Sequence, residues 1–245
     1  GVAPLGVVFD GTGTTYIGGG GRPFHNLEYR WSFGDGGYAI GPVAGHIYET
    51  PGNYFVSLMV TDGLYVAFVG TQVTVSEFAG VTVEVPASTQ SNFNTILTTH
   101  AGANKRILLR RGDTYTANAA GNISVAGLIL GAYGSGALPV INAGNVSVIN
   151  AIAGANDLRV MDLEIVGSGV GATSAAVACV ALSNLTLLRL KVRETGKGFT
   201  TTGSNKLTGA VIQGCEVSNY HASGGVGFFG YALNSALIGN TFGPA

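Results

Sequence analysis

The chain has 245 residues, of which 12 are Lys or Arg and 13 are Asp or Glu, so its formal net charge is −1. Charged residues make up 10% of the sequence, against about 25% in an average soluble domain. This argues against a nucleic-acid partner, because such a protein needs a cationic surface to displace counterions. The 40 Gly residues argue against a charged helical bundle. The composition therefore predicts a glycine-rich, β-dominated protein.

A mean hydropathy of +0.36 raises the question of a membrane span. Between Thr114 and Asn156 the sequence has no charged residue, but Asn, Ser, Thr and Gly interrupt it throughout. No run of about 18 apolar residues is present, so we predict no membrane span. Cys179 and Cys215 are the only cysteines. Two cysteines are too few for a disulfide framework or a zinc ligand set, and their redox state stays open.

The first 80 residues carry a formal charge of −4 and the rest +3, which indicates two domains. We place them at residues 1–79 and 80–245. In the first, apolar and polar residues alternate over 5–9, 27–33 and 54–60, and 66–75 completes the set of predicted strands. Turn residues such as Gly34–Gly37 separate these strands. Several short strands with turns between them predict an immunoglobulin-like β-sandwich.

Three motifs in this half are more specific: Trp31–Gly36, His46–Val56 and Val60–Asp62. Together they make residues 1–78 resemble a PKD domain. The resemblance implies an extracellular or cell-surface sandwich that acts as a spacer or contacts carbohydrate or protein, without catalysis. Within it we expect His46 to be structural and Asp35 to cap backbone amides. A weak Ca²⁺ site at Asp35 is the only cofactor that we consider.

The second half contains an internal repeat. Four similar segments begin at Val160, Leu187, Ile212 and Leu237, with spacings of 27, 25 and 25 residues. Each has apolar residues at its first, fourth and sixth positions, except for Asn240. One such unit cannot bury its own apolar face, but stacked units form a continuous core. A short amphipathic segment over 91–100 is expected to be a helix that caps the first coil.

Two further segments, Ile107–Tyr115 and Leu128–Ile141, look like the first coils of this solenoid. Residues 82–242 resemble the right-handed parallel β-helix of the pectin-lyase-like class. That class includes lyases, hydrolases, phage spikes and adhesins, so the fold alone does not give the function. The last repeat ends at Phe242 without a capping helix. We therefore expect the solenoid to be truncated at its C-terminal end, or another chain to cover that end.

Outward side chains of successive coils stack in columns about 4.8 Å apart. The repeat predicts one column of Asp162, Arg189, Gly214 and Gly239, and a second of Glu164, Lys191, Glu216 and Thr241. Arginine and lysine in such columns could hold uronate or sulfate groups, and nearby aromatic rings could stack on sugars. The candidate glycan-binding residues are Asp162, Glu164, Arg189, Lys191, Arg193, Glu216, Tyr220 and His221. The simpler interpretation, which we favour, is a surface ladder of alternating charges.

No complete catalytic set is recognisable. A lyase needs a neutralised carboxylate and a base, and the available cations lie beside acidic residues. Glu164 and Glu216 are two coils apart, about 9.6 Å by the strand spacing, a separation that suits an inverting hydrolase. However, Lys191 lies between them. The tripeptide Arg111-Gly112-Asp113 matches a cell-attachment sequence, and we interpret it as coincidental.

Three functions remain open. The leading hypothesis is a non-catalytic adhesion or decoration module, extracellular or on a cell or virion surface. It would contact polysaccharide or neighbouring protein subunits, as a homo-oligomer or in a larger assembly. The alternatives are the N-terminal portion of a polysaccharide-active enzyme, a lyase rather than a hydrolase, and a purely structural spacer.

Overall fold

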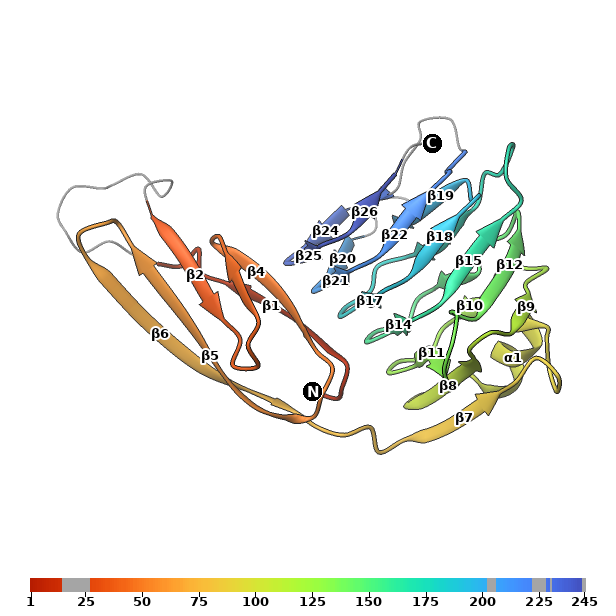
Figure 1. The fold of residues 1–245 in the computed structure, drawn as a ribbon, viewed down its shortest axis with the longest axis horizontal. Helices are drawn as coiled ribbons and strands as arrows, with labels where there is room; N and C mark the ends of the chain where they lie inside the picture. Colours follow the sequence, from red (N-terminus) through yellow and green to blue (C-terminus); the bar gives the residue numbers. More distant parts are fainter. Residues whose placement is uncertain (15–26, 202–205, 222–227, 230, 244–245) are drawn as a thin grey trace. The chain divides into compact units, whose positions relative to one another are not determined.

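The computed structural model of the chain describes residues 1–14, 27–201, 206–221, 228–229 and 231–243 (Figure 1). The chain divides into two compact units, Gly1–Phe78 and Ala79–Ala245. The predicted all-β class is confirmed: the first unit consists of antiparallel sheets and the second is a parallel β-solenoid. Among the residues described, no helix is long and apolar enough to cross a bilayer.

Two antiparallel sheets form the N-terminal unit. One has the strand order β3-β2-β5-β6 and the other pairs β1 with β4. The strands are β1 Leu5–Asp10, β2 Glu28–Ser32, β3 Tyr38–Ile40, β4 Val43–Tyr48, β5 Gly52–Thr61 and β6 Val66–Val75.

Alternation along the strands places one side of each sheet in the core of this unit. On β2, Tyr29 and Trp31 are buried while Glu28 and Arg30 are exposed. Successive side chains of a strand point to opposite faces, so this pattern fixes the inner face of the four-stranded sheet. The buried residues of this core are Phe9, Tyr29, Trp31, Phe33, Ala44, Tyr48, Val56, Leu58, Val60 and Val75.

The solenoid makes about six turns from residue 81 onward, and its strands form three parallel sheets. The first sheet contains β7 Val81–Val85, β8 Lys105–Arg110, β11 Ile129–Tyr133, β14 Arg159–Met161, β17 Thr186–Leu188, β21 Val211–Gln213 and β25 Ala236–Ile238. The second contains β9 Thr114–Thr116, β12 Val140–Gly144, β15 Glu164–Gly167, β18 Lys191–Arg193, β22 Glu216–Ser218 and β26 Thr241–Phe242. The third contains β10 Asn122–Ile123, β13 Ile149–Ala151, β16 Ala175–Cys179, β19 Lys197–Thr201 and β23 Phe228–Phe229. A separate pair joins β20 Lys206–Thr208 to β24 Tyr231–Leu233.

The repeat seen in the sequence is one strand from the first sheet, a corner, and one strand from the second. Val160 lies in β14 and Ile165 in β15, and both are fully buried. The first residue after β14, Asp162, has a φ of 54°, and Arg189 has a φ of 50° at the same corner one coil later. The residues of the first column therefore lie between two strands, not within one. They lie at a left-handed corner, which turns the chain from one sheet to the next.

One helix, α1 Phe93–His100, lies in the segment predicted to cap the solenoid. Asn92 begins the helix, because its side-chain oxygen accepts a hydrogen bond from the N–H of Thr95 at 2.9 Å. Phe93 and Ile96 are fully buried and belong to the solenoid core. The helix therefore covers apolar side chains of the first coils.

At the opposite end, the last coil is the least covered. Leu237 is 54% exposed although the equivalent Ile212 is buried. Asn240 stands where earlier coils have a buried apolar residue. Its side chain accepts a hydrogen bond from the N–H of Cys215 at 2.8 Å and donates one to the carbonyl of Ile212 at 2.8 Å. Asn240, the one polar residue at this position of the repeat, thus links the last two coils through hydrogen bonds to backbone groups.

Candidate functional site

The first predicted column carries a bidentate ion pair at the corner between the first and second sheets. Arg189 donates from Nε and Nη2 to the two carboxylate oxygens of Asp162, at 2.8 and 2.9 Å. Arg111 also approaches Asp162, with Nη2 at 3.6 Å from Oδ1. Gly214 and Gly239 continue the corner without side chains. Arg111 was not among the predicted site residues, since it lies outside the aligned repeats.

The second column lies in register along the second sheet. Backbone pairing places Lys191 between Glu164 and Glu216, with Thr241 beyond them. Glu164 accepts a hydrogen bond at 2.7 Å from Nε of Arg193, which is two residues beyond its direct partner. The ammonium of Lys191 has no ion pair within 4 Å among the residues that the structure describes. Lys191 and Glu216 are both exposed.

A second left-handed corner follows this sheet and brings three more side chains together. Glu194 has a φ of 58°. Its Oε1 accepts a hydrogen bond from Asn219 Nδ2 at 2.7 Å, and its Oε2 lies 2.9 Å from His221 Nε2. These hydrogen bonds, from His221 first and Asn219 second, lower the pKa of the Glu194 carboxyl below its usual value. Tyr220 packs partly against the solenoid core, which reduces the ring area that could meet a sugar.

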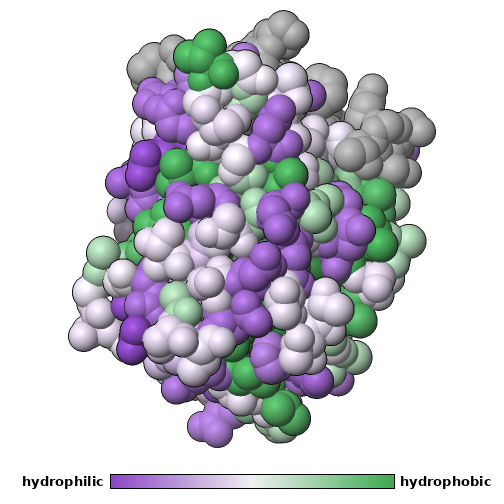
Figure 2. Space-filling model, turned by 90° about the vertical axis from the view of Figure 1, so that its right-hand side faces the viewer, coloured by the Kyte–Doolittle hydropathy of each residue, from purple (hydrophilic) through white to green (hydrophobic). Residues whose placement is uncertain are grey.

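Two ion pairs therefore join four of the candidate residues, Asp162 with Arg189 and Glu164 with Arg193. The pairing of Lys191 with its column neighbours, which the ladder interpretation expects, is not among the ion pairs of the described residues. Arginine forks hold carboxylates in fixed orientations, and both candidate arginines have a carboxylate partner among the candidates. The face of the solenoid in Figure 2 shows a band of hydrophilic residues between small hydrophobic patches. Glycan binding by these residues remains a prediction.

A separate cluster surrounds His46 in the N-terminal unit. Its Nε2 lies 2.6 Å from Oδ2 of Asp35, and its ring stacks on Phe33 with centroids 4.3 Å apart. Asp35 Oδ1 accepts the N–H of Gly37 at 2.9 Å, the backbone cap expected from the turn. Burial of the Asp35 carboxyl opposes ionisation, but the hydrogen bonds from His46 and Gly37 outweigh it and lower its pKa. His46 thus links a turn to the aromatic core.

Metal-ligating residues do not gather at this turn. In the described parts of the chain, no group of three or more His, Cys, Asp or Glu side chains is placed to hold a metal ion. The weak Ca²⁺ site considered for Asp35 gains no further ligand from the geometry.

Comparison with known proteins agrees with the motifs around Trp31 and His46. The sequence model of the PKD family matches residues 7–75. The N-terminal unit is a PKD domain. PKD domains are typical of extracellular proteins. Among curated proteins, none matches the chain.

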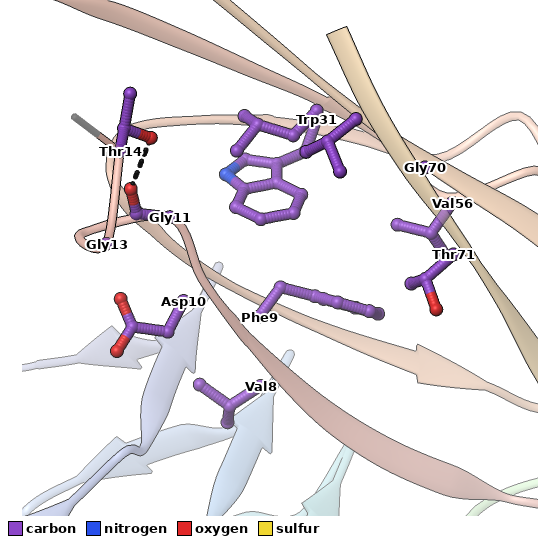
Figure 3. Close-up of a pocket in the computed structure, with 12 residues that line it drawn as sticks. Val8, Phe9, Asp10, Gly11, Gly13, Thr14, Trp31, Val56, Gly70 and Thr71 are labelled. Atoms are coloured by element: carbon purple, nitrogen blue, oxygen red, sulfur yellow. Dashed lines mark hydrogen bonds between the residues drawn. The ribbon is translucent and has the colours of Figure 1, made fainter. Parts of the chain in front are cut away.

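The PKD domain contains a cavity of about 490 Å³. It lies beside the rings of Phe9 and Trp31, and Figure 3 shows them with Val56 and Thr71 around the same space. The carboxylate of Asp10, at the rim, already accepts hydrogen bonds from the N–H and hydroxyl of Thr12. The described lining offers apolar contact but few polar groups to orient a ligand.

The charged side chains of the tripeptide Arg111-Gly112-Asp113 form hydrogen bonds within the solenoid. Asp113 accepts two hydrogen bonds from Arg110, at 2.9 and 3.0 Å, and a third from the N–H of Ala87 at 2.8 Å. Arg111 donates to the carbonyl of Gly136 at 3.3 Å. These contacts support the interpretation of the tripeptide as coincidental.

Neither cysteine forms a disulfide, and both lie in the solenoid interior. Burial raises the pKa of the Cys179 thiol to about 12 and that of Cys215 to about 11. Since the thiolate is the reactive form, both side chains act as small core residues.

Proposed function

We propose that the chain is an extracellular adhesion module that contacts glycans through the second sheet of its solenoid and the adjoining corners. The PKD domain and the β-solenoid support the general assignment to an adhesion or structural module. The observation that carries the finer proposal is the stacked polar column Glu164–Lys191–Glu216 with its flanking ion pairs. This arrangement repeats polar groups along a straight line at the strand spacing.

The side chains around Lys191 are arranged to contact an extended ligand. Arg193 is bonded to Glu164 through Nε, and a guanidinium has further N–H donors on its Nη atoms. Lys191 supplies an ammonium without a described ion-pair partner. A sugar carboxylate or sulfate could pair with Lys191 while hydroxyl groups bond to the neighbouring carboxylates. Because Arg193 and Glu164 already hold each other in place, these two side chains lose less conformational entropy on binding.

Replacing Lys191 with alanine tests this proposal. We expect Lys191→Ala to weaken binding to an acidic polysaccharide such as polygalacturonate by roughly fivefold, since an exposed ion pair contributes up to about 1 kcal/mol. Binding isotherms measured by calorimetry would show the change. Lys206→Ala removes another exposed lysine, on β20 outside this sheet, and should leave the isotherm unchanged.

Two results would count against the proposal. Identical isotherms for the parent chain and Lys191→Ala would leave the columns as a structural ladder only. Release of unsaturated uronide by the chain, detected by ultraviolet absorbance, would favour the polysaccharide lyase over a non-catalytic module.

A further inference from the structure

The outward side of the four-stranded sheet in the PKD domain carries a group of large apolar side chains among polar ones. Backbone pairing aligns Ile40, Arg30, Met59 and Phe68 in one row across all four strands. Directly paired residues of an antiparallel sheet point to the same side, and this side is opposite to the buried Trp31. We define the outer apolar face as Tyr38, Ile40, Phe55, Met59, Val66 and Phe68.

All of these side chains except the half-buried Met59 are exposed. Tyr38 is 80% exposed, Ile40 75%, Phe68 73% and Phe55 67%. The ring of Phe55 lies over Gly70 and covers the one gap in β6. An aromatic side chain can bury about 150–250 Å², so the three rings alone offer on the order of 400 Å².

The aliphatic members raise this area towards the roughly 800 Å² that each partner contributes to an interface of standard size. An area of this order is that of the largest apolar patch on a typical protein, about 300–600 Å², and such patches are often functional. The outer apolar face is therefore large enough to support a specific interface.

The charges around this face do not oppose contact with an identical surface. Glu28 and Arg30 lie on the same side of the sheet and pair with each other at 3.1 Å. Strand β6 has ten residues and contains neither a charged residue nor proline. Natural sheets commonly place such residues on outer strands to prevent association. The face thus has no net charge, and its outer strand β6 lacks the charges and prolines that usually prevent association.

We propose that the outer apolar face binds the same face of a second copy of this chain. Two sheets would pack face to face, with aligned or crossed strands about 10 Å apart. A two-fold axis would bring each apolar row against its counterpart, which gives a closed dimer. The branched and flexible side chains of Ile40, Met59 and Val66 suit interdigitation with protein side chains better than contact with flat sugar rings. This inference is independent of the glycan site on the solenoid.

Two neighbouring residues of β6 provide a matched test. Phe68 and Val69 are 73% and 64% exposed, but they point to opposite sides of the sheet. Sedimentation velocity of the complete 245-residue chain, from about 1 to 100 µM, should show a monomer–dimer equilibrium. We expect Phe68→Lys to weaken dimerisation at least tenfold, because it places a charge in the interface. Val69→Lys adds the same charge on the other side and should change it less than twofold.

Each other outcome would overturn the proposal. A parent chain that stays monomeric at 100 µM excludes the dimer, and equal weakening by both substitutions indicates edge-to-edge pairing of β6. A dimer that persists in Phe68→Lys has its interface elsewhere. Fluorescence of Trp31, the only tryptophan, reports whether each variant retains a folded PKD domain.

Discussion

At the scale of single residues, the solenoid depends on positions that adopt left-handed backbone conformations. Asp157, Asn184, Gly209 and Asn234 have φ values of 57°, 59°, 70° and 46°, and they recur with the same spacing as the predicted strands. Asn and Asp tolerate this conformation better than other non-glycine residues. These four residues therefore form the corner that leads each coil into the first sheet.

Asn184 gives a direct test of this corner. Its side chain is exposed, so Asn184→Ala should act mainly through the backbone and lower the free energy of unfolding by about 1 kcal/mol. Asn184→Gly keeps the left-handed conformation accessible and should be neutral or slightly stabilising. Urea unfolding followed by circular dichroism would measure both. Equal midpoints for the two variants would mean that the backbone conformation does not limit stability here.

The residue types of the candidate site were predictable, but several of their partners were not. The period placed Asp162 beside Arg189 and Glu164 beside Lys191. The contacts of Glu164 with Arg193 and of Glu194 with His221 depend on corner geometry and side-chain rotation. Neither follows from counting residues along the chain.

At the scale of secondary-structure elements, Tyr115 connects three segments at the start of the solenoid. Its hydroxyl donates a hydrogen bond to the carbonyl of Val85 in β7 and accepts one from the N–H of Arg110 in β8, while its own backbone lies in β9. The side chain is fully buried. A buried hydroxyl with both roles satisfied fixes the relative positions of these strands.

Removing only this hydroxyl should be costly. Tyr115→Phe keeps the ring but leaves the carbonyl of Val85 without this donor, so we expect a loss of about 1–3 kcal/mol in stability. Hydrogen exchange should also accelerate in β7 and β8. Tyr133→Phe, at a partly exposed tyrosine of β11, is the matched control and should change neither quantity. If both variants unfold at the same urea concentration, the hydroxyl is not a structural link.

Local alternation predicted strands, but the repeat pattern did not show the corners between them. The apolar pattern from Val160 to Ile165 fits one six-residue strand as well as two short strands joined by a bend. Gly214 and Gly239, at the third position of two repeats, were the signal for the bend, because a left-handed φ favours glycine. Asp162 and Arg189 at the same position concealed it.

At the scale of the whole molecule, each unit has its own core, and the chain has few charges, many of which form ion pairs within the described residues. Several of its carboxyl groups are held ionised by local hydrogen bonds. Those of Asp35 and Asp113 have lowered pKa values, the first through His46 and Gly37 against the opposing effect of burial, the second mainly through Arg110. The pKa of the Glu194 carboxyl is lowered in the same way, mainly by the hydrogen bond from His221. The ordinary values are 3.8 for Asp and 4.5 for Glu.

These shifts predict acid sensitivity with a definite sign. A carboxyl whose pKa is lower in the folded state stabilises folding fully above its unfolded value, and this contribution is lost as the pH falls through the folded value. The urea midpoint followed by Trp31 fluorescence should therefore decrease from pH 6 to pH 3. In Asp35→Asn the decrease should be smaller, because one contributing group is gone. Glu28→Gln removes an exposed carboxylate of the same domain and should respond like the parent. An equally steep decrease in Asp35→Asn would show that the His46–Asp35 contact does not stabilise the PKD domain.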